Sequence, residues 1–151
     1  MRTRLLEPEI VIASPVSRAL EAYARLISKS GGEVAQGSAG PQPLGLAELP
    51  GDIIVLLSTQ PILSFAWPIT DRGRYLLAIQ TDRVPPLNVS AVARNVIAHE
   101  LGRTLGLIHN SNPTTLMCGP CRAGVFKSAG PSFLPLTSQD RARLLELNPS
   151  Q

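Results

Sequence analysis

The spacing of apolar and polar residues predicts a strand followed by a helix at the start of the chain. Residues 9–13 form a short β-branched run that stops at Ser14, which is typical of a strand. Pro15 opens a stretch that reaches Lys29, with apolar residues spaced by three and four, as on one face of an α-helix. Ser14 is the expected N-cap of this helix, with Pro15 at its first position.

The next section predicts the rest of a sheet. Residues 33–36 are a candidate strand, and residues 37–50 are a loop rich in Gly and Pro. Residues 52–57 are a continuous apolar run, as expected of a strand that is buried on both faces. Residues 74–80 are a further candidate strand, because they mix β-branched, aromatic and leucine side chains. Two prolines then end this part of the chain.

A long helix is predicted after the prolines. Asn88 or Ser90 is its expected N-cap, and the helix runs to about Leu105. Its apolar residues are expected to anchor it to the sheet, and they are Val92, Val96, Ile97 and Leu101.

The end of the chain predicts an irregular segment and one last helix. Residues 109–135 show no helical or strand period. Thr137 then begins a helix that reaches Leu147, and Asp140 stands at the third helical position, as in a capping box. The order of elements predicts a single α+β domain over residues 1–151, with an α/β-like upper part.

Composition supports a folded chain and excludes some partners. Of 151 residues, 44% are apolar and 17% charged, which is typical of a globular domain. The net charge of +3 comes from twelve Arg and two Lys that are scattered and not interleaved with aromatic residues. We therefore expect no nucleic-acid partner. No apolar run approaches the ~20 residues of a membrane helix, so we expect no membrane span.

The first residues leave the cellular location open. They are basic, but Glu7, Pro8 and Glu9 interrupt the apolar core that a signal peptide needs. Two locations are therefore compatible with the sequence. The protein is cytoplasmic, or it is secreted or periplasmic if a leader is missing from this sequence.

The chemistry of the chain is concentrated in residues 99–109, which read His-Glu-Leu-Gly-Arg-Thr-Leu-Gly-Leu-Ile-His. His99 and Glu100 fall on the long predicted helix. Gly106 can end that helix with a positive φ and turn the chain so that His109 comes back toward His99. Imidazoles are common metal ligands, and a carboxylate beside a metal is a common general base.

This passage resembles the zinc-binding motif of the metzincin metallopeptidases, His-Glu-x-x-His-x-x-Gly-x-x-His. The chain is most similar to small bacterial matrixin-like proteins that are described as predicted zinc-dependent proteases. The resemblance is densest over residues 92–121, which include Leu-Gly-Leu-Ile-His-Asn and Pro-Thr-Thr-Leu-Met-Cys, and it resumes over residues 135–144. The first ninety residues match only in the order of their elements.

The resemblance implies a zincin-like fold and a zinc peptidase. The expected fold is a twisted mixed sheet packed on an N-terminal helix and an active-site helix, with a C-terminal helix. The expected site holds one zinc ion with His99 and His109, uses Glu100 as the general base toward a zinc-bound water, and has Met117 as its Met-turn. The implied partner is a peptide or protein substrate in extended conformation, cleaved by a monomeric metalloendopeptidase.

Arg103 is where the chain departs from the family pattern. It stands at the position of the second His, and a guanidinium has no lone pair with which to bind a metal. The chain has only two histidines, so three imidazoles cannot be assembled. A unit charge ~5 Å from a divalent ion also repels it by several kcal/mol at an effective dielectric of ~20. Arg103 either swings outward or stays inside, paired with Glu100 or with a substrate carboxylate.

Cys118 and Cys121 are the only cysteines, and they form the sequence Cys-Gly-Pro-Cys. A local disulfide that stiffens the loop after Met117 is one interpretation. Cys118 as a replacement zinc ligand is a second, since thiolates bind zinc well. A thioredoxin-like redox motif is a third, but it needs a strand before it and a helix after it, and residues 122–131 are poor in helix formers.

Two functions are therefore weighed on the sequence. The first is a matrixin-like zinc metalloendopeptidase whose activity is impaired by Arg103. The second is a catalytically inactive pseudopeptidase, a peptide-binding module that captures a peptide or its C-terminal carboxylate through Arg103.

Overall fold

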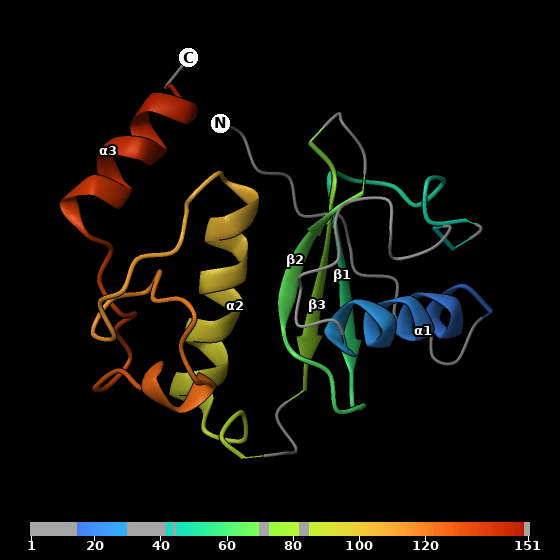
Figure 1. Cartoon of the computed structure of the whole chain (residues 1–151), viewed down its shortest axis with the longest axis horizontal. Helices are drawn as coiled ribbons and strands as arrows, with labels where there is room; N and C mark the ends of the chain where they lie inside the picture. Colours follow the sequence, from blue (N-terminus) through green and yellow to red (C-terminus); the bar gives the residue numbers. More distant parts are fainter. Residues whose placement is uncertain (1–14, 30–41, 44, 70–72, 82–84, 150–151) are drawn as a thin grey trace. The chain divides into compact units, whose positions relative to one another are not determined.

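A computed structural model describes residues 15–29, 42–43, 45–69, 73–81 and 85–149 of the chain. These residues form three α-helices, one short 3₁₀ helix and three strands, so the protein has mixed α+β structure, as predicted. They group into two compact units, one ending at Gln80 and the other beginning at Thr81 (Figure 1). The prediction of one domain over residues 1–151 stays a prediction. The candidate strands at residues 9–13 and 33–36 lie outside the described residues.

The first unit contains helix α1 and the sheet. Helix α1 spans Pro15–Lys29, with the bounds that its apolar period predicts. Strand β1 spans Ile53–Ser58, β2 spans Phe65–Pro68 and β3 spans Tyr75–Gln80. The strand order is β1-β3-β2, with β1 parallel and β2 antiparallel to β3. The described strands therefore form a small mixed sheet.

Strand β2 was not predicted from the sequence. It has only four residues, and a proline ends it. Alternation is hard to recognise over so few residues, and proline is confined to sheet edges because it cannot donate a ladder hydrogen bond. Pairing with β3, in the register Ala66 to Leu77, is what gives this segment its extended form.

Strand β1 is not buried on both faces, which corrects the prediction for residues 52–57. Its side chains alternate, with Ile54 and Leu56 buried and Val55 and Leu57 more than half exposed. The buried pair belongs to the same core cluster as the buried residues of helix α1, which lies beside β1 in Figure 1. The remaining core residues of this unit are Leu20, Tyr23, Ala24, Ile27, Leu46, Ile62, Trp67, Ile69, Leu76 and Ala78.

The second unit contains helix α2, the 3₁₀ helix η1 and helix α3. Helix α2 spans Ser90–Thr104, η1 spans Ala123–Val125 and α3 spans Ser138–Leu147. The cap of α2 corrects the prediction, because Val89 occupies the N-cap position and makes no side-chain cap hydrogen bond. Neither Asn88 nor Ser90 caps the helix. None of the described helices is long and apolar enough to cross a membrane.

The apolar residues of α2 are divided differently from the prediction. Val92 and Val96 pack with Leu87, Cys118 and Phe126, in a cluster that the irregular segment after α2 completes. From the sequence we expected Val92 and Val96 to pack on the sheet, because no local pattern shows that the irregular segment folds back along the helix. Ile97 and Leu101 are partly exposed, and their packing on the sheet stays a prediction.

Helix α3 begins with the capping box that the sequence predicted. The Thr137 hydroxyl accepts a hydrogen bond from the Asp140 backbone N–H, and the Asp140 carboxylate accepts one from the Thr137 N–H, at 3.0 and 2.9 Å. Arg143, on the next turn, donates to the carbonyl of Gly106 at 2.7 Å. The helix is thereby fastened to the turn that follows α2.

Candidate functional site

Gly106 provides the turn that brings the two histidines together. Its φ is +89°, a left-handed conformation that glycine adopts without strain, as predicted. The N–H of Leu107 bonds to the carbonyl of Gly102, which closes the end of α2. A Cβ at Gly106 would lie 2.6 Å from Leu147 Cδ1, the end of an exposed side chain, so the positive φ is the stronger reason for glycine here.

The imidazoles of His99 and His109 lie side by side. Their ring centroids are 5.1 Å apart with an interplanar angle of 28°, and the two Nε2 atoms are 3.1 Å apart. The predicted return of His109 to His99 is therefore confirmed. Two nitrogens at this separation can both reach one ion at the ~2.0–2.1 Å typical of zinc and imidazole.

His99 is oriented by a hydrogen bond that the sequence did not indicate. Its Nδ1 lies 2.7 Å from the carbonyl oxygen of Leu116, so Nδ1 carries the proton and donates. The Nε2 lone pair then faces His109. Phe126 holds the ring from the side, edge-on, with a centroid distance of 5.1 Å. This is the kind of support that fixes a metal-binding imidazole in one tautomer.

Both imidazoles are held neutral near pH 7. Burial lowers the pKa of His99, the hydrogen bond to the Leu116 carbonyl opposes this, and the charge of Arg103 lowers the pKa further. Burial, followed by the charges of Arg103 and His99, lowers the pKa of His109 to about 4. In the neutral pair, the Nε2–H of His109 donates to Nε2 of His99. If the proton of His109 moves from Nε2 to Nδ1, the Nε2 lone pairs of both histidines can face one ion.

Arg103 lies inside the site and binds the backbone. Its Nη1 donates to the carbonyl of Leu107 at 3.0 Å. The pairing of Arg103 with Glu100 that the sequence suggested stays a prediction. The guanidinium lowers the pKa of both histidines, so its charge acts on the same space in which a cation would bind. Glu100 is itself buried on α2.

Met117 is fully buried behind the end of α2. It packs with Leu107 and Leu116, and a Cβ at Gly102 would lie 2.8 Å from its sulfur. Glycine on this helix face therefore makes room for the methionine. The role of Met117 as a Met-turn stays a prediction.

Cys118 and Cys121 are joined by a disulfide. Cys118 is buried, and a disulfide sulfur is not the thiolate that a zinc ligand requires. Arg122 alone separates Cys121 from the short helix η1, which has only three residues. The disulfide interpretation of this pair thus fits the described residues best, and neither the replacement ligand nor the thioredoxin-like motif is supported.

The residues that the sequence analysis missed are backbone and glycine positions around His109. The carbonyls of Leu116 and Leu107 have no sequence signal, since every residue has one. Gly119 packs against the His109 ring, and its place between two cysteines was the available hint. Asn110 joins the site to α3 by a long hydrogen bond of 3.4 Å to Asp140.

Two potential metal ligands, His99 and His109, meet at this site. Among the described residues, no group of three or more His, Cys, Asp and Glu side chains could hold a metal ion. The 3.1 Å separation of His99 Nε2 and His109 Nε2 fits a metal held by two imidazoles, with other positions open. The cation of Arg103 beside them weakens that fit.

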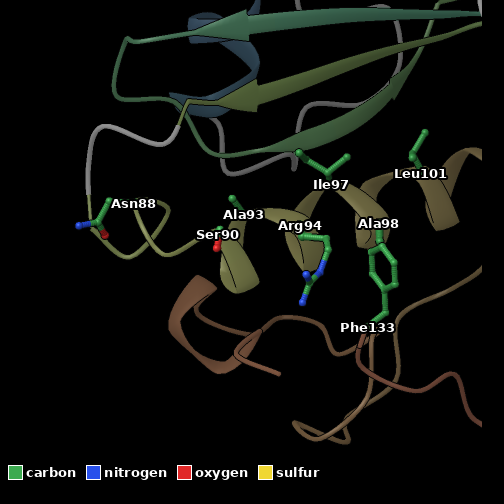
Figure 2. A pocket seen from close by; sticks show the side chains of 8 residues that line it. All are labelled: Asn88, Ser90, Ala93, Arg94, Ile97, Ala98, Leu101 and Phe133. Atoms are coloured by element: carbon green, nitrogen blue, oxygen red, sulfur yellow. The ribbon is translucent and has the colours of Figure 1, made fainter. Parts of the chain in front are cut away.

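A separate pocket of about 420 Å³ lies on the opposite side of α2 (Figure 2). At about 100° per residue, its lining residues on α2 lie roughly 100–180° around the helix from His99. The Arg94 guanidinium lies 5.2 Å from the ring centroid of Phe133 and donates to the carbonyls of Gly130 and Ser132. These contacts organise the loop beside the pocket, which is not part of the histidine site.

No protein-family model, no curated protein and no solved structure matches the chain.

Proposed function

We propose that the chain is a matrixin-like zinc metalloendopeptidase of metzincin fold, with a metal site weakened by Arg103. The observation that supports this most is the 3.1 Å approach of the Nε2 atoms of His99 and His109. The mixed sheet, the helix that carries His99 and the capped last helix are compatible with the fold that we propose.

Each site residue has a distinct part in this proposal. His99 and His109 would hold the ion, and the Leu116 carbonyl orients His99 for that purpose. A bound zinc would supply Lewis-acid polarisation of a peptide carbonyl and activation of a water. Glu100, one residue after His99, would act as the general base toward that water.

Arg103 sets the level of activity that we expect. A third imidazole is missing, and the guanidinium repels a divalent ion. Its hydrogen bond to the Leu107 carbonyl holds it beside the histidines, so it is not simply displaced when a cation enters. Native activity is therefore expected to be weak.

The test restores the missing imidazole. The native chain, Arg103→His, and Arg103→His with Glu100→Gln are each incubated with zinc and a set of quenched fluorescent peptides. Arg103→His should cleave peptides at least ~100-fold faster than the native chain. Adding Glu100→Gln to Arg103→His should lower that rate by about 10²–10⁴-fold, while the zinc content stays at one per chain. If Arg103→His binds zinc but cleaves no peptide, the peptidase proposal is wrong.

A second candidate is a pseudopeptidase that binds peptides without cleaving them. It is favoured by Arg103, whose guanidinium lies beside the two histidines, bonds to the Leu107 carbonyl and is a group that binds carboxylates well. The two neutral histidines beside it add no negative charge. This candidate predicts that free-acid peptides bind at least ~10-fold more tightly than their C-terminal amides, and that Arg103→Gln abolishes the difference.

A further inference from the structure

The loop that follows Met117 links the disulfide to His109. We propose that the Cys118–Cys121 disulfide is a redox-sensitive clamp on the imidazole of His109. When the disulfide is intact, it holds Gly119 against the ring. When a dithiol reductant opens it, the ring is released and metal binding weakens. The metal part of this inference rests on the proposed function, whereas the clamp on His109 does not.

Gly119 forms the surface on which the His109 ring lies. A Cβ built on Gly119 would be 2.5 Å from His109 Nδ1 and 2.6 Å from His109 Cδ2, distances that real Cβ atoms do not adopt. The backbone of Gly119 is thus in direct contact with the ring, along the edge that includes Nδ1. A small movement of this peptide must move the imidazole or leave a gap beneath it.

Backbone hydrogen bonds connect the disulfide loop to the segment that carries His109. The Gly119 N–H donates to the carbonyl of Asn110 at 2.9 Å, and the Asn110 N–H donates to the carbonyl of Met117 at 2.8 Å. Asn110 and Cys118 therefore form an isolated parallel bridge. His109 precedes Asn110 directly, so a displacement on one side of the bridge reaches the imidazole on the other.

The buried end of the disulfide, Cys118, packs against Phe126, the residue whose ring contacts His99. Cys118 is 1% exposed and packs with Val92, Val96 and Phe126, and the Phe126 ring touches His99 edge-on. The disulfide closes a ring around Gly119 between this anchor and Cys121. An intact disulfide therefore keeps Gly119 in a fixed position relative to both imidazoles.

Cys121 is the end that a reductant can reach. It is partly exposed, and Pro120 and Arg122 beside it are exposed. A dithiol attacks the Cys121 sulfur and forms a mixed disulfide, and Cys118 leaves as a thiol after taking up a proton. The second thiol of the reductant then displaces Cys121. Two electrons and two protons pass to the protein, and the reductant leaves as a cyclic disulfide.

The test uses the fact that the chain has two histidines. Imidazole NMR spectra of the metal-free chain are recorded with the disulfide intact and after reduction by dithiothreitol. We expect the His109 resonances to shift and broaden, while those of His99, held by Leu116, change much less. Unchanged His109 resonances would overturn the clamp.

Zinc affinity is measured in parallel, and no reductant is added, because a thiol reductant would itself bind zinc. The oxidised native chain is compared with Cys118→Ala/Cys121→Ala and with Gly119→Ala, and both variants should bind zinc at least ~10-fold more weakly. Gly124→Ala is the matched control, because a Cβ there meets nothing within 4 Å, and it should bind as the native chain does. Equal affinity in all four proteins contradicts the clamp.

The two proposals fail in different ways. If the oxidised native chain binds no zinc, the proposed function is wrong, and the clamp is then judged by the His109 resonances of the metal-free protein alone. If zinc binds but neither the resonances nor the affinity depend on the disulfide, the proposed function stands and the clamp is wrong.

Discussion

The Nδ1 atom of His99 donates a hydrogen bond of 2.7 Å to the carbonyl oxygen of Leu116, a residue seventeen positions later. Leu116 is held in turn, because its N–H donates to the carbonyl of Pro135 at 2.9 Å. The irregular segment after α2 thus fixes one tautomer of His99, so that its Nε2 faces His109.

The histidine pair predicts a particular pH dependence of stability. The pKa values of His99 and His109 are lowered in the folded protein, that of His109 to about 4, whereas the unfolded value is 6.5. Between these values the unfolded state binds more protons, so the free energy of unfolding falls as the pH drops from 6.5 to about 4.

This is measured by urea unfolding of the metal-free protein at several pH values in that range. His109→Gln is the control, because it removes the imidazole whose pKa is lowered to about 4 and should flatten the dependence. If the native chain shows no more loss of stability than His109→Gln, the neutral histidine pair is not present in solution.

Arg103 affects zinc binding through both charge and ligation. Arg103→Gln removes the positive charge without adding a ligand, and we expect zinc affinity to rise about 10-fold. Arg103→His removes the charge and adds an imidazole four residues after His99, and the increase should be larger by a further factor of at least ~10. Competition with a chromophoric chelator gives both values. Equal affinities in the two variants would show that residue 103 does not face the metal.

Gly102 is expected to be intolerant of a side chain despite its place in a helix. Alanine favours helices over glycine by about 1 kcal/mol, but a Cβ here would lie 2.8 Å from the buried sulfur of Met117. The overpacking should dominate, and Gly102→Ala should lower the free energy of unfolding by about 1–3 kcal/mol. Urea unfolding tests this, with Gly124→Ala as the control. A stabilised Gly102→Ala protein would mean that Met117 packs elsewhere.

The capping box of α3 makes a measurable contribution. Thr137→Ala removes the hydroxyl that accepts the Asp140 N–H and should lower the free energy of unfolding by about 1 kcal/mol. Ser138→Ala is the matched control, since Ser138 is exposed and one residue away. Its stability should change by less than about 0.5 kcal/mol. Similar effects of the two substitutions in thermal or urea unfolding would contradict the cap.

The helices of this fold were predictable, and the sheet was only partly so. Pro15 and the apolar period that follows it mark α1, and Thr137 with Asp140 marks α3, because helix ends carry local signals. Strand β2 has no such signal, since its structure depends on pairing with β3. The apolar run of β1 also could not reveal that one of its faces is exposed.

In the candidate site, the positions of the side chains could be predicted in part, whereas the backbone groups that orient them could not. The spacing of His99, Gly106 and His109 predicted that the two imidazoles meet, because the helix and its glycine turn are local. The carbonyls that position His99 and Arg103 could not be predicted. Their identity depends on how residues 107–118 fold back on α2, and any residue type could supply them.

Zinc titration of the native chain beside His109→Gln tests the histidine pair most directly. Calorimetry or chelator competition at pH 7.5 should show about one zinc ion per native chain and a loss of affinity of at least ~100-fold in His109→Gln. A native chain that binds no zinc, or a variant that binds it equally well, would contradict the account of a two-imidazole metal site.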